Sequence, residues 1–109
     1  MVWAEYANFT VTGEDSLYQL HIGDYNGNAG DASMPGTDKA LDEMKFSTVD
    51  HDNDDWEYNC ALVVGGGFWY SNCEWMLVNS IVEKDKYFYW ETDISAHYLK
   101  SCRAMLMCF

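Results

Sequence analysis

The sequence has few basic residues and no long apolar run. Its 109 residues include 6 Lys and Arg against 18 Asp and Glu, a net charge of −12 at pH 7. Nucleic acids and anionic membranes bind through clustered cations, so this balance argues against both as partners. No run of about 18 apolar residues forms a membrane span, and no segment has the pattern of a signal peptide. We therefore expect either an intracellular chain or a mature piece of something larger.

The sequence also lacks any Cys-x-x-Cys pair, which argues against a zinc ribbon or a thioredoxin-like site. An even number of cysteines in a short chain favours disulfides and a secreted protein. The N-glycosylation sequon at Asn8 points the same way. The four cysteines are Cys60, Cys73, Cys102 and Cys108.

Catalytic signatures are missing as well. No nucleophile elbow, phosphate loop or Cys/His arrangement occurs. Asp50 and Glu57 could form a carboxylate pair, but nothing marks a glycosidase cleft around them. We therefore expect a protein that is not an enzyme.

What the sequence does have is apolar content arranged mostly with strand periodicity. A hydrophobic fraction of 49% and an aromatic fraction of 17% argue against a disordered acidic chain. Alternation at 9–11 and 18–22, around a Gly-containing break, predicts a β-hairpin. We expect a fold of the α+β class dominated by antiparallel strands. The other predicted elements are a surface loop at 23–36, a short helix at 38–44 and strands at 46–49, 87–90 and 104–109.

An acidic cluster at 50–57 carries five carboxylates in eight residues. Most charge runs are solvated loops, and that interpretation stays open. The alternating carboxylates also suit calcium, which takes six to eight oxygen ligands. The spacing is not that of an EF-hand, because Asp55 stands where the glycine belongs and Ala61 where the final glutamate belongs.

Several motifs follow one another along the chain: the spaced aromatic residues of 3–32, Phe-Ser-Thr at 46–48, the alternating acidic run at 50–54, Asn-Cys-Ala at 59–61 and the glycine-aromatic segment at 66–73. Together these motifs resemble one family, the fibrinogen C-terminal domain. The resemblance implies a twisted antiparallel sheet with short helices and a long calcium-loop region. Residues 1–109 would be a partial domain that lacks the N-terminal subdomain and part of the loop that builds the binding pocket.

The resemblance also implies specific site residues. Calcium would be held by the side chains of Asp52 and Asp54 and by the backbone carbonyls of Trp56 and Tyr58. Cys60 would pair with Cys73, closing a loop of about 14 residues, which contributes roughly 3 kcal/mol on a chain-entropy estimate. A cis peptide bond would precede Cys73.

A ligand pocket is expected near that peptide bond, formed by Tyr70, Asn72, Cys73, Glu74 and Tyr89. Lectin-like members of the family have an aromatic residue and a histidine where this chain has Val64 and Glu74. The segment between Cys73 and Trp90 is shorter than is usual in the family. Cys102 and Cys108 have no recognised counterpart, and their pairing stays open.

Two functions follow from the resemblance. The first is a secreted, calcium-binding lectin-like glycoprotein that recognises N-acetylated glycans in innate immunity. The alternative is an extracellular protein-interaction module of matrix, adhesion or receptor signalling without sugar binding. Either module could be oligomeric within the full-length protein.

Overall fold

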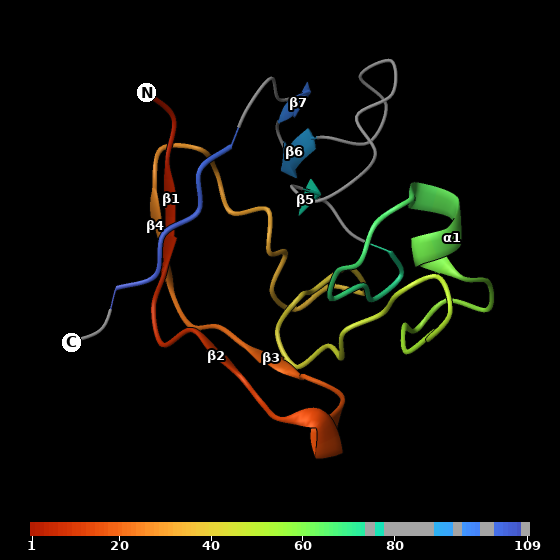
Figure 1. Cartoon of the computed structure of the whole chain (residues 1–109). Helices are drawn as coiled ribbons and strands as arrows, with labels where there is room; N and C mark the ends of the chain where they lie inside the picture. Colours follow the sequence, from red (N-terminus) through yellow and green to blue (C-terminus); the bar gives the residue numbers. More distant parts are fainter. Residues whose placement is uncertain (74–75, 78–88, 93–94, 99–101, 108–109) are drawn as a thin grey trace.

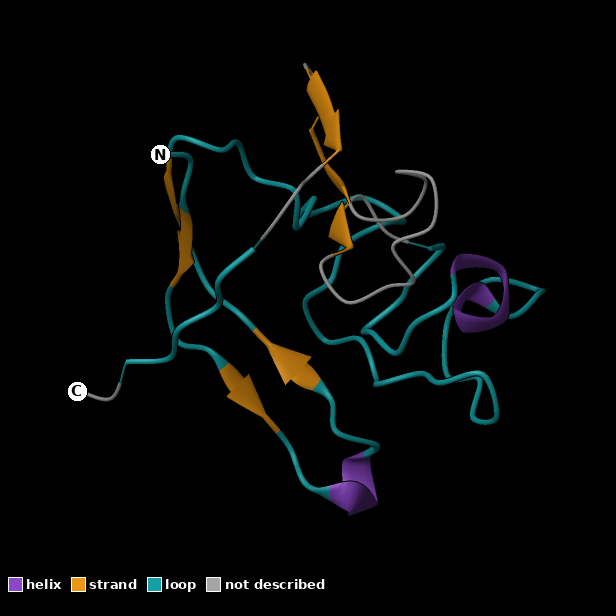
Figure 2. Ribbon diagram, turned by 45° about the horizontal axis from the view of Figure 1, so that its top comes forward, coloured by secondary structure: helices purple, strands orange, loops and turns teal. Residues whose placement is uncertain are grey.

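The computed structural model describes residues 1–73, 76–77, 89–92, 95–98 and 102–107 (Figure 1). The regular elements are short and separated by long loops (Figure 2). Three small antiparallel sheets pair β1 with β4, β2 with β3, and β5 with β6 and β7. In chain order the elements are β1 (Ala4–Tyr6), β2 (Thr10–Val11), the 3-10 helix η1 (Glu14–Ser16), β3 (Leu20–His21), β4 (Tyr25–Gly27), α1 (Cys60–Val64), β5 (Met76–Leu77), β6 (Tyr89–Thr92) and β7 (Ser95–Tyr98).

The predicted N-terminal hairpin is confirmed. β2 pairs antiparallel with β3, and Val11 lies opposite Leu20. The turn between them contains η1, followed by Leu17 and Tyr18 in the left-handed region at φ 55°. This hairpin carries Leu20 into the core, where it is almost fully buried.

The segment 23–36, expected as a loop, contains strand β4. This strand pairs with β1, and its register places Tyr6 opposite Tyr25 and Ala4 opposite Gly27. Gly27 has a φ of 153°, and a Cβ there would clash with the Trp3 carbonyl oxygen. Strand β4 therefore depends on a glycine that lets its backbone approach Trp3 closely. The alternation of apolar and polar side chains does not predict a strand of this kind.

The predicted helix at 38–44 is wrong. Its backbone groups bond to distant residues: the Leu41 N–H donates to Ser33 O and the Glu43 N–H to Leu20 O. The Asp42 carboxylate also accepts the Ile22 N–H at 2.9 Å. Tertiary hydrogen bonds thus replace the helical ones and draw Leu41 into the core.

Two predicted strands differ from the structure, and one is found in part. Residues 46–49 form only isolated bridges, from Ser47 to Phe68 and from Thr48 to His51. Residues 104–107 are exposed and have no regular structure, while 108–109 lie outside the described residues. Strand β6 (Tyr89–Thr92) overlaps the strand predicted at 87–90, of which residues 87–88 also lie outside the described part.

The core lies between the hairpin, the loop before α1 and the glycine-aromatic segment. Tyr70 is fully buried and Phe68 nearly so, with their rings edge-on at 5.9 Å. Trp69 is only partly buried, and its indole N–H donates to Tyr18 O at 2.8 Å. The buried cluster consists of Leu20, Ala32, Leu41, Cys60, Ala61, Val64, Phe68, Tyr70 and Met76.

We expect Leu41→Ala to lower the free energy of unfolding by about 2–5 kcal/mol, because Leu41 is almost fully buried and its removal leaves a cavity. Leu106→Ala is the matched control, since that side chain is 77% exposed. A surface substitution of this kind should change the free energy of unfolding by less than about 0.5 kcal/mol. Denaturant unfolding of both variants checks this. Equal effects of the two substitutions would contradict the placement of the core.

Candidate functional site

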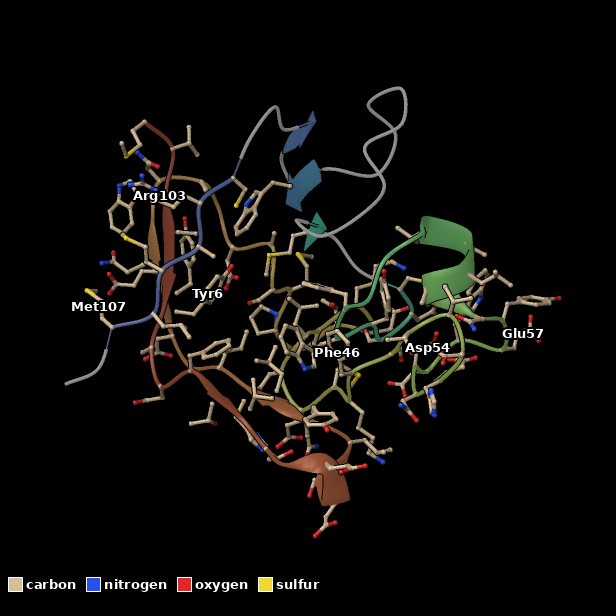
Figure 3. The ribbon with its side chains drawn as sticks, in the orientation of Figure 1. Tyr6, Phe46, Asp54, Glu57, Arg103 and Met107 are labelled. Carbon is tan, nitrogen blue, oxygen red and sulfur yellow. A yellow bond between two sulfur atoms is a disulfide. The ribbon has the colours of Figure 1, made fainter. Side chains whose placement is uncertain are left out.

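Three segments meet at the side of the molecule opposite β1: the acidic loop 50–57, helix α1 and the stretch 71–73 (Figures 1 and 3). The Asp55 N–H donates to Ser71 O at 3.0 Å, which joins the loop to the stretch. The Cys60 and Cys73 sulfurs are bonded, which joins the helix to the same stretch. Two independent links therefore hold the three segments as one unit.

The acidic loop is anchored to the core through Asn53. Its backbone N–H donates to Ser47 Oγ at 2.9 Å, and its side-chain Nδ2 donates to Phe46 O at 2.9 Å. Ser47 is fully buried. Its N–H donates to Phe68 O at 2.9 Å, and the Phe68 N–H donates to Ser47 O at 3.1 Å. Asn53 therefore fixes the middle of the acidic loop against residues 46–47.

Asp54 is the most constrained carboxylate of the loop. One of its oxygens accepts the Trp56 N–H at 2.9 Å, and the other accepts the Cys60 N–H at 2.9 Å. Asp52 lies beside it, since its carboxylate accepts the Asp54 N–H at 3.3 Å. Burial, together with the neighbouring Asp52 carboxylate, raises the pKa of Asp54 although the two N–H donors oppose the shift. Two like charges are thus held together, an arrangement that a cation would relieve.

The oxygen donors of this loop fit calcium. The backbone carbonyls of Trp56 and Tyr58 accept no hydrogen bond from the described residues, so both oxygens are available as ligands. The described part of the chain contains no group of three or more His, Cys, Asp or Glu side chains suited to a metal. Carbonyl oxygens and water would therefore have to complete the shell around two carboxylates, which calcium accepts. The ligand set Asp52, Asp54, Trp56 and Tyr58 stays a prediction.

Helix α1 is short and starts at a well-formed cap. Asn59 Oδ1 accepts the Leu62 N–H at 3.0 Å, and Gly65 ends the helix in the left-handed region at φ 94°. No helix is expected here from hydrophobic periodicity, although an asparagine N-cap and a glycine directly after the last helical residue are the signals that mark it. The helix starts at the site, because the N–H of its first residue, Cys60, donates to Asp54.

The disulfide implied by the resemblance is present in the structure. Cys60 and Cys73 lie 5.7 Å apart at their Cα atoms, and Cys60 is fully buried. The bridge closes its loop beside the acidic cluster, so it restrains the position of α1 against the stretch 71–73.

The cis peptide bond expected before Cys73 is wrong: the Asn72–Cys73 bond is trans. Other contacts hold this stretch. The Asn72 N–H donates to Asp38 O at 3.3 Å, and Lys39 Nζ donates to Asn72 O. The Ser71 N–H donates to Cys73 O at 2.8 Å. The loop around 38–39, rather than an unusual peptide bond, therefore sets the conformation here, and no sequence signal had pointed to it.

The structure describes only part of the predicted pocket. Tyr70 is fully buried in the core, so its ring does not form the wall of a surface pocket. Val64 is also buried. Asn72 and Cys73 are partly exposed, Glu74 lies outside the described residues, and only the backbone of Tyr89, in β6, is described.

Comparison with known proteins places the chain in a family. Residues 1–106 match the family described as the C-terminal globular domain of fibrinogen beta and gamma chains. The chain belongs to the fibrinogen C-terminal domain family. It is 44% identical to the human fibrinogen alpha chain over 85 residues, which are 72% of this chain and 10% of that one. It is 38% identical to bovine fibrinogen-like protein 1 over 91 residues, 78% of this chain and 29% of that one.

Solved structures of the family have the same fold. The fibrinogen-like globe domain of human ANGPTL6 matches with a TM-score of 0.68 at 35% identity, over 76% of this chain and 35% of that one. A lamprey fibrin D-dimer, solved with the peptide Gly-His-Arg-Pro-amide, matches with a TM-score of 0.68 at 27% identity, over 85% of this chain and 32% of that one. The chain thus spans about a third of these solved chains, and the predicted α+β fold of this fibrinogen domain is confirmed.

Family membership decides the localisation that the sequence left open. Fibrinogen chains, fibrinogen-like proteins and angiopoietin-like proteins are secreted, so the predicted extracellular localisation is confirmed. Among the described residues, no helix has the length and apolar character of a membrane span. Asn8 of the sequon is exposed, and its glycosylation stays a prediction.

We expect the native fibrinogen domain to react with a maleimide at Cys102, because this cysteine is free and exposed. Cys60 and Cys73 should be protected as a disulfide. Peptide mapping by mass spectrometry without reduction should recover Cys60 linked to Cys73 and Cys102 modified. Modification of Cys60 or Cys73 in the native protein would contradict the assigned pairing.

Proposed function

We propose that this fibrinogen domain is an extracellular protein-interaction module whose binding region is held in place by calcium. One observation carries the proposal: the acidic loop is bonded to the stretch 71–73 directly, through Asp55 and Ser71, and also through Asp54 and the Cys60–Cys73 disulfide. A cation that orders the acidic loop would therefore also restrain the stretch 71–73. Binding in this family's fold would then depend on calcium without the ion touching the ligand.

Calcium is proposed to bind between the carboxylates of Asp52 and Asp54, with the carbonyls of Trp56 and Tyr58 as further ligands. The proximity of Asp52 and Asp54 supports this, since a divalent cation relieves their repulsion. The direct hydrogen bonds to Asp54 also support it, because they preorganise the carboxylate before an ion arrives.

A protein ligand fits the described residues better than an N-acetylated glycan. Two positions expected to enclose an acetyl group hold buried side chains, Tyr70 and Val64, that face the core. The lamprey relative is solved with a peptide ligand. Lectin-like binding in innate immunity, the first hypothesis from the sequence, is therefore the second candidate. Neither function requires catalysis, and we propose that the module is not an enzyme.

Calcium should raise the melting temperature of the chain by mass action, with about 2.7 kcal/mol of added stability at about 100 times the dissociation constant. Asp52→Asn should remove this response, because it deletes one of the two carboxylates. In chelator at pH 7 the same variant should be more stable than the wild type, by less than about 1 kcal/mol, because Asp54 no longer faces a like charge.

The pH dependence follows from the raised pKa of Asp54. The folded-state pKa of Asp54 lies above the unfolded value, so the ionised carboxylate destabilises the fold at neutral pH. This destabilisation disappears as the pH falls below about 4 and the carboxylate becomes protonated. The gain of Asp52→Asn in chelator should disappear over the same range. Asp24→Asn, an exposed aspartate in the turn before β4, is the control and should keep the calcium response. Identical calorimetric melting of the wild type in calcium and in chelator would overturn the calcium proposal.

Titration of isotope-labelled protein with Gly-His-Arg-Pro-amide and with N-acetylglucosamine separates the two candidate functions. We expect the peptide, in calcium, to shift the amide resonances of Asn72 and Cys73, because Glu74 favours a cationic group. The sugar should cause no shift. Sugar-induced shifts at these residues that disappear in chelator would favour the lectin instead, and no shift with either ligand would count against binding at this stretch.

A further inference from the structure

Four apolar side chains are exposed around α1, beside the acidic loop. Val49 is 53% exposed, Tyr58 61%, Leu62 65% and Val63 53%. Isolated exposed apolar residues are ordinary on protein surfaces, whereas a group of them marks an interaction site. We call these four residues the α1 patch. Helix α1 and Glu57, which precedes Tyr58, lie at the outer edge of the molecule (Figures 1 and 3).

Asn59 brings the members of the α1 patch together. Its Oδ1 accepts the Leu62 N–H at 3.0 Å, and its Nδ2 donates to Val49 O at 3.0 Å. Its carbonyl accepts the Val63 N–H at 3.2 Å. Tyr58 precedes it directly, and the Tyr58 ring packs edge-on against Trp56 with centroids 5.0 Å apart. The backbone segments that carry the four exposed residues are therefore held next to one another.

Carboxylates border the α1 patch. Asp50 follows Val49 and Glu57 precedes Tyr58, and both acids are exposed. No Lys or Arg occurs between residues 49 and 64, and the one basic group in that segment is His51, 3.5 Å from Asp50. The Thr48 hydroxyl donates to the Asp50 carboxylate at 2.7 Å and holds it at the edge of the patch. An apolar centre with an acidic rim is the complement of an apolar face bordered by cations.

We propose that the α1 patch docks a cationic amphipathic segment of a protein partner. Apolar side chains of that segment would cover Leu62 and Val63, and its Lys or Arg residues would pair with Asp50 and Glu57. Neither acid belongs to the proposed calcium ligands, and no patch residue belongs to the stretch 71–73. The surface is thus separate from the stretch proposed above to bind the peptide.

A second apolar and acidic region of the chain provides the matched control. Leu17 and Tyr18 follow Glu14 and Asp15 at η1, but they are only 39% and 47% exposed. Both are tied to the core through their carbonyls, which accept the Phe46 N–H and the Trp69 indole N–H. This region has similar residue types without the raised exposure of the α1 patch.

The test uses the full chain and a fluorescent helical peptide of about 15 residues, with Leu on one face and Lys on the other. Fluorescence anisotropy should show binding that weakens with added salt. A peptide with Glu in place of Lys should not bind. The double variant Leu62→Ser/Val63→Ser should weaken binding about tenfold, and Asp50→Asn/Glu57→Gln should do the same and flatten the salt dependence. The control Glu14→Gln/Tyr18→Ser should bind like the wild type.

Unchanged binding by Leu62→Ser/Val63→Ser would overturn the proposal, as would an equal loss in the η1 control. The four side chains replaced at and around the α1 patch are exposed, so circular dichroism should show that both variants fold. Asp50→Asn/Glu57→Gln should keep the calcium-dependent rise in melting temperature. Failure of the docking proposal is therefore distinguishable from failure of the calcium proposal.

Discussion

Repulsion within the acidic loop is the constraint on which the rest of the site depends. The loop has five carboxylates in eight residues. Asn53 bonds to Ser47 and Phe46, while the Asp52 carboxylate accepts the Asp54 N–H and lies beside the Asp54 carboxylate. The result is a pair of like charges with a raised pKa at Asp54, and this same pair makes the loop suited to a cation.

Two hydrogen bonds and one disulfide connect the acidic loop, helix α1 and the stretch 71–73. Asp54 accepts the Cys60 N–H at the start of α1, and the disulfide of Cys60 continues to Cys73. Asp55 bonds directly to Ser71. The helix, the loop and the stretch 71–73 therefore cannot move independently, and both proposed binding surfaces lie on this unit. The N-terminal hairpin contributes from the other side, through Trp69 and Leu20.

Much of the site could be predicted from local sequence patterns. The alternating carboxylates, the Asn-Cys-Ala motif and the glycine-aromatic segment indicated the family, because these motifs need only short-range sequence. The resemblance to the family then implied the disulfide. The hairpin was predictable because its alternation and its glycine break are local signals. Helix α1 could have been found from Asn59 and Gly65, and was missed because so short a helix shows no helical periodicity.

The elements that could not be predicted depend on distant partners. The segment 38–44 has a helical composition, but two of its N–H groups donate to the carbonyls of Ser33 and Leu20. The Asp42 carboxylate accepts the Ile22 N–H. Strand β4 exists because Gly27 lets the chain approach Trp3. Tyr70 looked like a pocket residue, and its full burial follows from packing against Phe68.

The sequence by itself determined the charge of the loop, which follows from residue identity, and it indicated the family through its motifs. The resemblance to that family then implied the cysteine pair. Only the tertiary structure decided which groups face outward. Tyr70 and Val64 are buried, whereas Leu62 and Val63 are exposed. The Asn72–Cys73 peptide bond is trans. The Asn72 N–H donates to Asp38 O, and the Asn72 carbonyl accepts a bond from Lys39. The physical reason is that burial and hydrogen-bond partners are properties of segments far apart in the chain, and these meet only when the chain has folded.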